Sequence, residues 1–171
     1  MKNNAFRKSL LVLAFSFFAV TGALAQFSIG VNLNLPMGTF GDVAGMGFGG
    51  GVAYDGAIND NLSWSAGLSY INFSGKDYTI PGFGTISGGS VGVLPIQAGI
   101  KYYFTESNAG FYGAADLGMW IGTASGASSE FGISPGVGYR AGAFDIGARY
   151  NIVSNLDNLG FRIAYVLGGG N

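Results

Sequence analysis

The sequence predicts an all-β protein, an eight-stranded antiparallel up-and-down β-barrel that crosses a membrane. Three observations lead to this class. Apolar and polar residues alternate with a period of two in segments of about ten residues, the length of a tilted transmembrane strand. Charged residues make up 10% of the chain and 32 of its 171 residues are glycine, against about 25% and about 7% in average soluble proteins. After the first segment, no stretch has a sustained helical period.

Residues 1–25 have the features of a cleavable signal-peptide helix. A start with three basic residues precedes an apolar run over residues 10–20, which is too short to span a bilayer as a helix. Ala23 and Ala25 then give the small-x-small pattern of a cleavage site. We therefore expect residues 26–171 to form one barrel domain after export. A single N-terminal membrane anchor is the alternative.

Eight alternating segments follow, each with apolar residues on one face and mainly Gly, Ser, Ala and Asn on the other. The first, third, fifth and seventh connections are longer on average than the other three. Short turns on one rim and longer loops on the other are typical of outer-membrane barrels. The expected strands are residues 27–35, 46–57, 62–73, 94–104, 111–121, 131–140, 144–153 and 159–167.

The connections carry two further predictions. Residues 36–45 are expected to form a loop. The longest break runs from Ser74 to Ser90, and within it two short apolar stretches flank Pro81 and Gly82. This arrangement predicts a small hairpin that extends the third and fourth strands beyond the barrel.

The apolar face is expected to contact lipid. A soluble barrel needs many charged residues on its outside, and the polar face here has few. Each strand instead places an aromatic residue outward at the end where the N-terminus lies, as in the aromatic belt at a membrane interface. The belt comprises Phe27, Tyr54, Trp64, Tyr102, Phe104, Phe111, Tyr139, Phe144 and Tyr165, and a less regular second belt comprises Phe48, Tyr70, Phe131, Tyr150 and Phe161.

Seven charged residues lie on the polar face and are expected to point into the lumen. On the lipid face each base would cost about 2–4 kcal/mol at the bilayer midplane. An eight-stranded barrel is just wide enough for its own side chains, so we expect a structural charge network and no wide channel; a proton or ion path is the alternative. Lys101 and Asp116 are expected to pair. The network comprises Asp55, Lys101, Asp116, Arg140, Asp145, Arg149 and Arg162.

Composition excludes several functions. The chain has no Cys and no His, which removes disulfides, thiolate metal sites and the commonest general base. Gly132-x-Ser134-x-Gly136 matches a nucleophile elbow, but it lies in a strand and no His could activate the serine. Residues 26–171 keep five basic residues against nine acidic ones, which argues against nucleic-acid binding. We expect no catalytic, cofactor-binding or metal site.

Residues 95–104, 144–150 and 159–165 resemble the fourth, seventh and eighth strands of small porin-family outer-membrane barrels of the OmpA and OmpX type. The resemblance implies location in the outer membrane of a Gram-negative cell, contact with its lipid, and insertion by the outer-membrane assembly machinery. That machinery reads an aromatic-ended final strand, so Tyr165 would serve here. Enzymes among such barrels resemble families that rely on His, so no activity is carried over.

These observations predict a non-enzymatic integral outer-membrane protein with a structural or surface-interaction role and a largely closed lumen. Residues 74–90 are the candidate contact element for a surface ligand or protein. Two alternatives remain open: a narrow pore or small-solute conduit across the outer membrane, and a secreted soluble β-barrel that binds a ligand.

Overall fold

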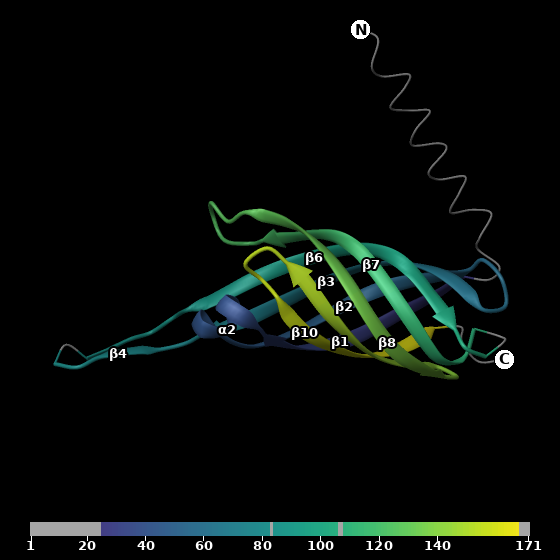
Figure 1. Cartoon of the computed structure of the whole chain (residues 1–171), viewed down its shortest axis with the longest axis horizontal. Helices are drawn as coiled ribbons and strands as arrows, with labels where there is room; N and C mark the ends of the chain where they lie inside the picture. Colours follow the sequence, from purple (N-terminus) through teal and green to yellow (C-terminus); the bar gives the residue numbers. More distant parts are fainter. Residues whose placement is uncertain (1–24, 83, 106–107, 168–171) are drawn as a thin grey trace, which may run out of the picture.

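The computed structural model describes residues 25–82, 84–105 and 108–167. The expected signal peptide therefore lies outside the described residues, except for Ala25. Within the described ranges, eight strands form one closed barrel in the order β1-β10-β9-β8-β7-β6-β3-β2, and every neighbouring pair is antiparallel (Figure 1). The predicted fold class is confirmed. The strands are β1 (Ala25–Pro36), β2 (Ala44–Ala57), β3 (Leu62–Gly75), β6 (Ser90–Tyr103), β7 (Gly110–Gly122), β8 (Ser129–Ala141), β9 (Phe144–Val153) and β10 (Asn158–Leu167).

The pairing of the first strand with the last closes the barrel. β1 and β10 keep an unbroken register, from Phe27 opposite Leu167 to Pro36 opposite Asn158. A closed sheet has no edge, so its backbone groups are satisfied between strands, as the hydrocarbon of a bilayer requires. No helix within the described part of the chain is long and apolar enough to cross a membrane.

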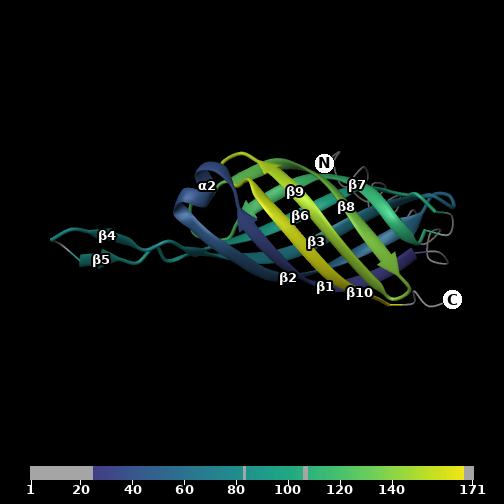
Figure 2. The same cartoon turned by 60° about the horizontal axis from the view of Figure 1, so that its bottom comes forward.

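The two ends of the barrel differ. At one end, here called the terminal end, β1 begins, β10 ends, and short turns join β2 to β3, β6 to β7 and β8 to β9. At the opposite end, here called the loop end, lie α2 (Gly38–Val43) and a separate two-stranded hairpin (Figures 1 and 2). This asymmetry agrees with the predicted connection lengths.

α2 corrects the expected loop over residues 36–45. The helix has six residues, too few for a helical period to be recognised in the sequence. Its one buried side chain is Phe40, whose ring centroid lies 5.0 Å from that of Phe73 on β3. α2 therefore covers the loop end of the barrel, where a plain surface loop was predicted.

The hairpin comprises β4 (Tyr78–Ile80) and β5 (Gly84–Ile86) and confirms the prediction for this break. It projects along the barrel axis well beyond the other loops (Figure 2). β3 and β6 are also longer than predicted at this end, because their ladder continues to Ser74 opposite Ser90. The hairpin thus grows out of the barrel wall.

The base of the hairpin is held against α2. The backbone N–H of Lys76 donates to the carbonyl of Val43 at 3.0 Å. The Lys76 ammonium donates to the carbonyl of Gly41. The carboxylate of Asp77 accepts the N–H of Gly88 at 3.2 Å and so joins the two sides of the stem.

Candidate functional site

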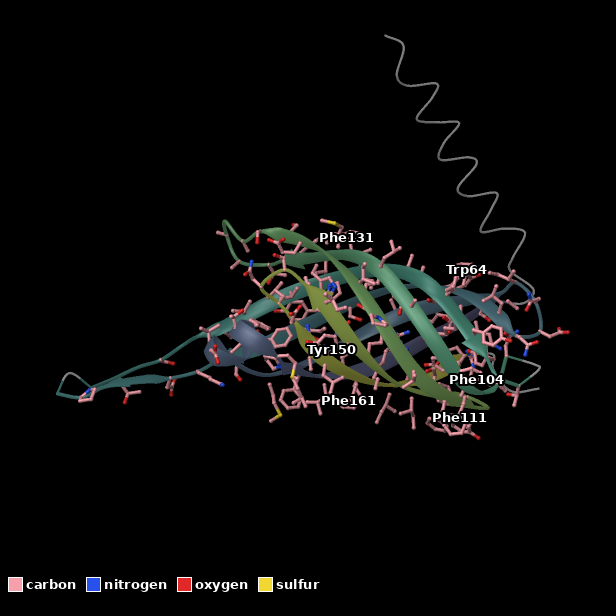
Figure 3. All side chains as sticks on the ribbon, viewed as in Figure 1. Trp64, Phe104, Phe111, Phe131, Tyr150 and Phe161 are labelled. Atoms are coloured by element: carbon pink, nitrogen blue, oxygen red, sulfur yellow. The ribbon has the colours of Figure 1, made fainter. Side chains whose placement is uncertain are left out.

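The outward face of the barrel is apolar along its whole middle. Val31, Leu117 and Val137 are 64%, 55% and 64% exposed, values that would be unusual for such residues in water but are expected beside lipid. The structure places all nine predicted belt residues on the outward face near the terminal end, and Phe104, Phe111 and Trp64 are seen there in Figure 3. Tyr54 and Trp64 are the two half-buried members.

Belt residues contact one another in pairs. Ring centroids lie 5.5 Å apart in Tyr54–Trp64, 5.9 Å in Tyr102–Phe104, 4.6 Å in Phe111–Tyr139 and 5.6 Å in Phe144–Tyr165. Phe27 lies opposite Tyr54 in the β1–β2 ladder. Tilted and edge-to-face pairs of this kind add to the stability gained from area burial. Phe131, Tyr150 and Phe161 lie nearer the loop end and project outward (Figure 3).

Inside the barrel, Lys101 is shared by two carboxylates. Its Nζ lies 2.8 Å from Asp55 Oδ2 and 3.0 Å from Asp145 Oδ2. Arg140 Nη1 lies 3.4 Å from the same Asp55 oxygen. All four side chains are buried, and we call them the terminal cluster.

The expected Lys101–Asp116 pair is wrong. In the β6–β7 ladder Lys101 lies opposite Ala114, whereas Asp116 lies opposite Gly99. Asp116 is therefore one inward position farther toward the loop end. In a barrel this narrow, side chains reach across the lumen, and both ion pairs of Lys101 are with carboxylates of the non-adjacent strands β2 and β9.

Asp116 belongs to a second cluster. Arg149 Nε lies 2.5 Å from Asp116 Oδ2, and Ser65 Oγ donates to Asp116 Oδ1 at 2.9 Å. Arg162, the seventh predicted residue, donates to Ser28 Oγ at 3.2 Å. The seven charges all face the lumen but form two clusters and one separate arginine.

Two inward tyrosines close the terminal end, and sequence reasoning did not single them out. Tyr103 and Tyr112 are almost fully buried, with ring centroids 5.2 Å apart. Tyr112 donates its hydroxyl to Asp145 Oδ1 at 2.5 Å, and Lys101 Nζ lies 5.2 Å from its ring centroid. Both tyrosines lie at positions that alternate in step with the inward charges of their strands. This spacing could have indicated from the sequence that they point into the lumen.

The loop end is filled by an apolar cluster that sequence reasoning also missed. The alternation of the strands assigned apolar residues to the lipid face. At the loop end, where the barrel extends past the bilayer, apolar side chains can instead point inward and form a core. Ile71 and Phe73 alternate with the outward-facing Tyr70, so their positions in the sequence could have indicated apolar side chains inside the barrel. The cluster, here called the apolar plug, comprises Phe40, Ala44, Ile71, Phe73, Val93, Trp120 and Val153, with Leu156 packed against it.

Below the plug lies a layer of asparagines. Asn34 and Asn151 each donate a side-chain N–H to Asn158 Oδ1 at 2.7 Å. Asn158 donates in turn to the carbonyl of Leu156 at 2.7 Å. The layer therefore links β1, β9 and β10 near the loop end through a connected set of side-chain hydrogen bonds.

Bulky inward side chains fit over glycines of neighbouring strands. A Cβ on Gly136 would lie 2.6 Å from Arg149 Cγ, and a Cβ on Gly47 would lie 2.6 Å from Phe73 Cδ1. A Cβ on Gly138 would overlap the Tyr112 ring. Many of the inward glycines are therefore required for space, as the crowded inner face predicted.

Replacing Gly138 by alanine is expected to lower the free energy of unfolding by about 1–3 kcal/mol, because the added methyl group displaces Tyr112 from Asp145. Urea unfolding in detergent micelles measures the change. Gly50→Ala is the matched control: Gly50 faces outward, and the nearest heavy atom to its Cβ would be a carbonyl oxygen at 3.5 Å. Equal destabilisation by both substitutions would contradict the spatial role of Gly138.

A cavity of about 80 Å³, lined by both polar and apolar residues, remains in the lumen. Its lining includes Asn32, Gln97, Trp120, Arg149 and Arg162. Ser134, the serine of the sequence motif, is fully buried and accepts a hydrogen bond from Gln97 at 2.8 Å. Across the described ranges, no three carboxylates lie close enough together to hold a metal ion.

No protein-family model and no curated protein matches this sequence. Solved structures do match. The outer-membrane protein Ail of Yersinia pestis in a phospholipid nanodisc aligns with a TM-score of 0.56 at 14% identity, covering 84% of this chain and 99% of that one. This chain has the fold of a small transmembrane barrel.

Two further structures support that assignment. The crystal structure of Ail, described as the attachment invasion locus protein, aligns with a TM-score of 0.55 at 14% identity over 84% of this chain and 97% of that one. A de novo designed transmembrane β-barrel aligns with a TM-score of 0.55 at 15% identity over 83% of this chain and 95% of that one. At the level of fold, the resemblance to small eight-stranded outer-membrane barrels is confirmed.

Proposed function

We propose that this protein is a non-enzymatic integral outer-membrane protein that contacts a surface ligand or another protein through its projecting hairpin. The observation that carries the proposal is the contrast between the two parts of the molecule. Side chains fill the lumen from both ends, whereas β4 and β5 extend far past the barrel. The fold shared with the attachment invasion locus protein of Yersinia pestis supports a surface-interaction role.

The proposal includes export and insertion. Residues 1–25 would be removed as a signal peptide, the assembly machinery would insert the barrel with Tyr165 as its terminal aromatic signal, and the loop end would face outward. N-terminal sequencing of protein from the outer-membrane fraction tests the first step, and the expected first residue is Gln26. Heat-modifiable gel mobility tests the barrel. Release of the protein into detergent-free buffer would instead support the secreted soluble barrel.

Replacing residues 77–88 by Asn-Gly is expected to remove surface binding and to leave the barrel intact. The stem would still close, since Gly75 N–H donates to Gly89 O at 2.7 Å outside the replaced segment. Whole protein and variant, both in nanodiscs, are compared on a panel of immobilised host proteins and glycans. Binding lost with unchanged heat-modifiable mobility supports the proposal. Binding that survives, or no binding by the whole protein, contradicts it.

A narrow solute conduit is the second candidate, and the lumenal cavity of about 80 Å³ favours it. Planar-bilayer recordings separate the two functions. The closed-lumen proposal expects no steady single-channel steps, because the terminal cluster and the apolar plug block opposite ends of the lumen. Steady steps that increase in conductance when Trp120 or Tyr112 is replaced by alanine would establish the conduit.

A further inference from the structure

Arg162 is the one basic side chain of the charge network that has no carboxylate partner within the described part of the chain. Lys101, Arg140 and Arg149 each form an ion pair. Arg162 donates instead to the uncharged hydroxyl of Ser28 at 3.2 Å.

The excess of positive charge is a property of the whole network. Four basic groups face three carboxylates, and all three carboxylates already bind another cation. Glu130 has the same inward parity but lies at the loop end of β8, opposite Trp120, and forms no ion pair among the described residues. One positive charge is therefore left over near the middle of the lumen.

This charge borders the partly open lumenal cavity of about 80 Å³. The indole N–H of Trp120, a buried donor without a partner in the described structure, belongs to a residue of the same lining. Two acceptors, Asn34 Oδ1 and Asp55 Oδ1, are also unpartnered there. The Asp55 carboxylate lies between Lys101 and Arg140, so its charge is already balanced at the terminal end.

We infer that the lumen binds one small monovalent anion of the halide class beside Arg162. Arg162 is half-buried, and a charge withdrawn from bulk water is stable only when it is paired or solvated. The cavity has room for a single ion with some water. Only one charge needs compensation, which favours a monovalent ion over phosphate or sulfate. The anion would balance the extra positive charge of the lumen as a resident ion and would not be transported through the barrel.

Quenching of Trp120 fluorescence by bromide tests the inference. The chain has two tryptophans, and Trp64→Phe removes the one in the outer belt, so the cavity residue becomes the sole reporter. In nanodiscs, bromide is expected to quench this variant saturably. Adding Arg162→Gln is expected to weaken the apparent affinity by at least about tenfold, the loss typical of a charged hydrogen-bond partner.

Three controls keep the result interpretable. Arg162→Lys retains the charge and is expected to retain saturable quenching, whereas Ser69→Ala changes an uncharged residue of the lining and is expected to have no effect. Acrylamide, a neutral quencher, should act equally on all variants. Linear quenching by bromide in the Trp64→Phe parent, or saturable quenching that persists in Arg162→Gln, overturns the inference. If Arg162→Gln fails to fold, linear quenching by bromide in the Trp64→Phe parent is still sufficient to overturn the inference.

Discussion

Replacing Lys101 by methionine is expected to lower the free energy of unfolding by about 3–5 kcal/mol, the cost of leaving buried charges without their partner. The substitution keeps the length of the side chain but removes the cation shared by Asp55 and Asp145. Asp55 keeps Arg140 at 3.4 Å, and among the described residues Asp145 keeps the Tyr112 hydroxyl as its hydrogen-bond partner. Urea unfolding of the barrel in lipid vesicles, followed by gel mobility and fluorescence, measures the loss.

Two companion variants show whether charge is the cause. Lys101→Met combined with Asp145→Asn restores the balance of the terminal cluster, and the asparagine oxygen can still accept from Tyr112. The pair is expected to recover at least half of the lost stability. Lys76→Met removes an exposed lysine at the hairpin base and should change stability by less than about 1 kcal/mol. A double variant as unstable as Lys101→Met would show that altered packing, and not the unbalanced charge, causes the loss of stability.

Replacing Leu117 by arginine is expected to destabilise the inserted barrel by about 2–4 kcal/mol, because the side chain points outward from the middle of β7 into the bilayer core. Leu117 lies opposite Ala98 and Ile133 on the two neighbouring strands. Among the described residues, no acidic side chain lies on the outward face at this level. The change in unfolding free energy in vesicles measures the cost.

Ala124→Arg is the matched control for this position. Ala124 is exposed in the connection between β7 and β8, at the loop end. The same charge added there should change stability by less than about 0.5 kcal/mol, as at other surface positions. If both variants lost equal stability, the middle of β7 would not face lipid.

Much of this fold could be predicted from the sequence, because strand parity is a local property. The alternation in residues 144–153 fixed that strand to the residue, and the inward parity of Lys101 and Arg149 was visible without any structure. Few charges and many glycines then decided which face meets lipid. A two-residue period, read together with composition, is therefore enough to predict the strands of the barrel wall and which face of each strand meets lipid and which meets the lumen.

Pairing across the lumen could not be predicted in the same way. The partners of Lys101 lie on β2 and β9, neither of which pairs with β6: β3 lies between β6 and β2, and β7 and β8 lie between β6 and β9. Their contact depends on the tilt and register of all eight strands together. α2 and the apolar plug were missed for a related reason: six helical residues carry no clear period, and parity alone does not say where the bilayer ends.

The direct chain connection from the barrel wall into the hairpin also determines how the molecule responds to mechanical load. β3 and β6 lead directly into the two sides of the hairpin stem, so tension on the hairpin tip pulls both strands along their own axes. Their outer neighbours resist by shear, through registers that extend from Gly47–Phe73 to Ala57–Ser63 on one side and from Val93–Gly122 to Tyr103–Tyr112 on the other. In this shear geometry the inter-strand hydrogen bonds of both ladders bear the force together, whereas in a peeling geometry they would break one after another. A pull on this hairpin would be carried by a large part of the membrane-embedded wall.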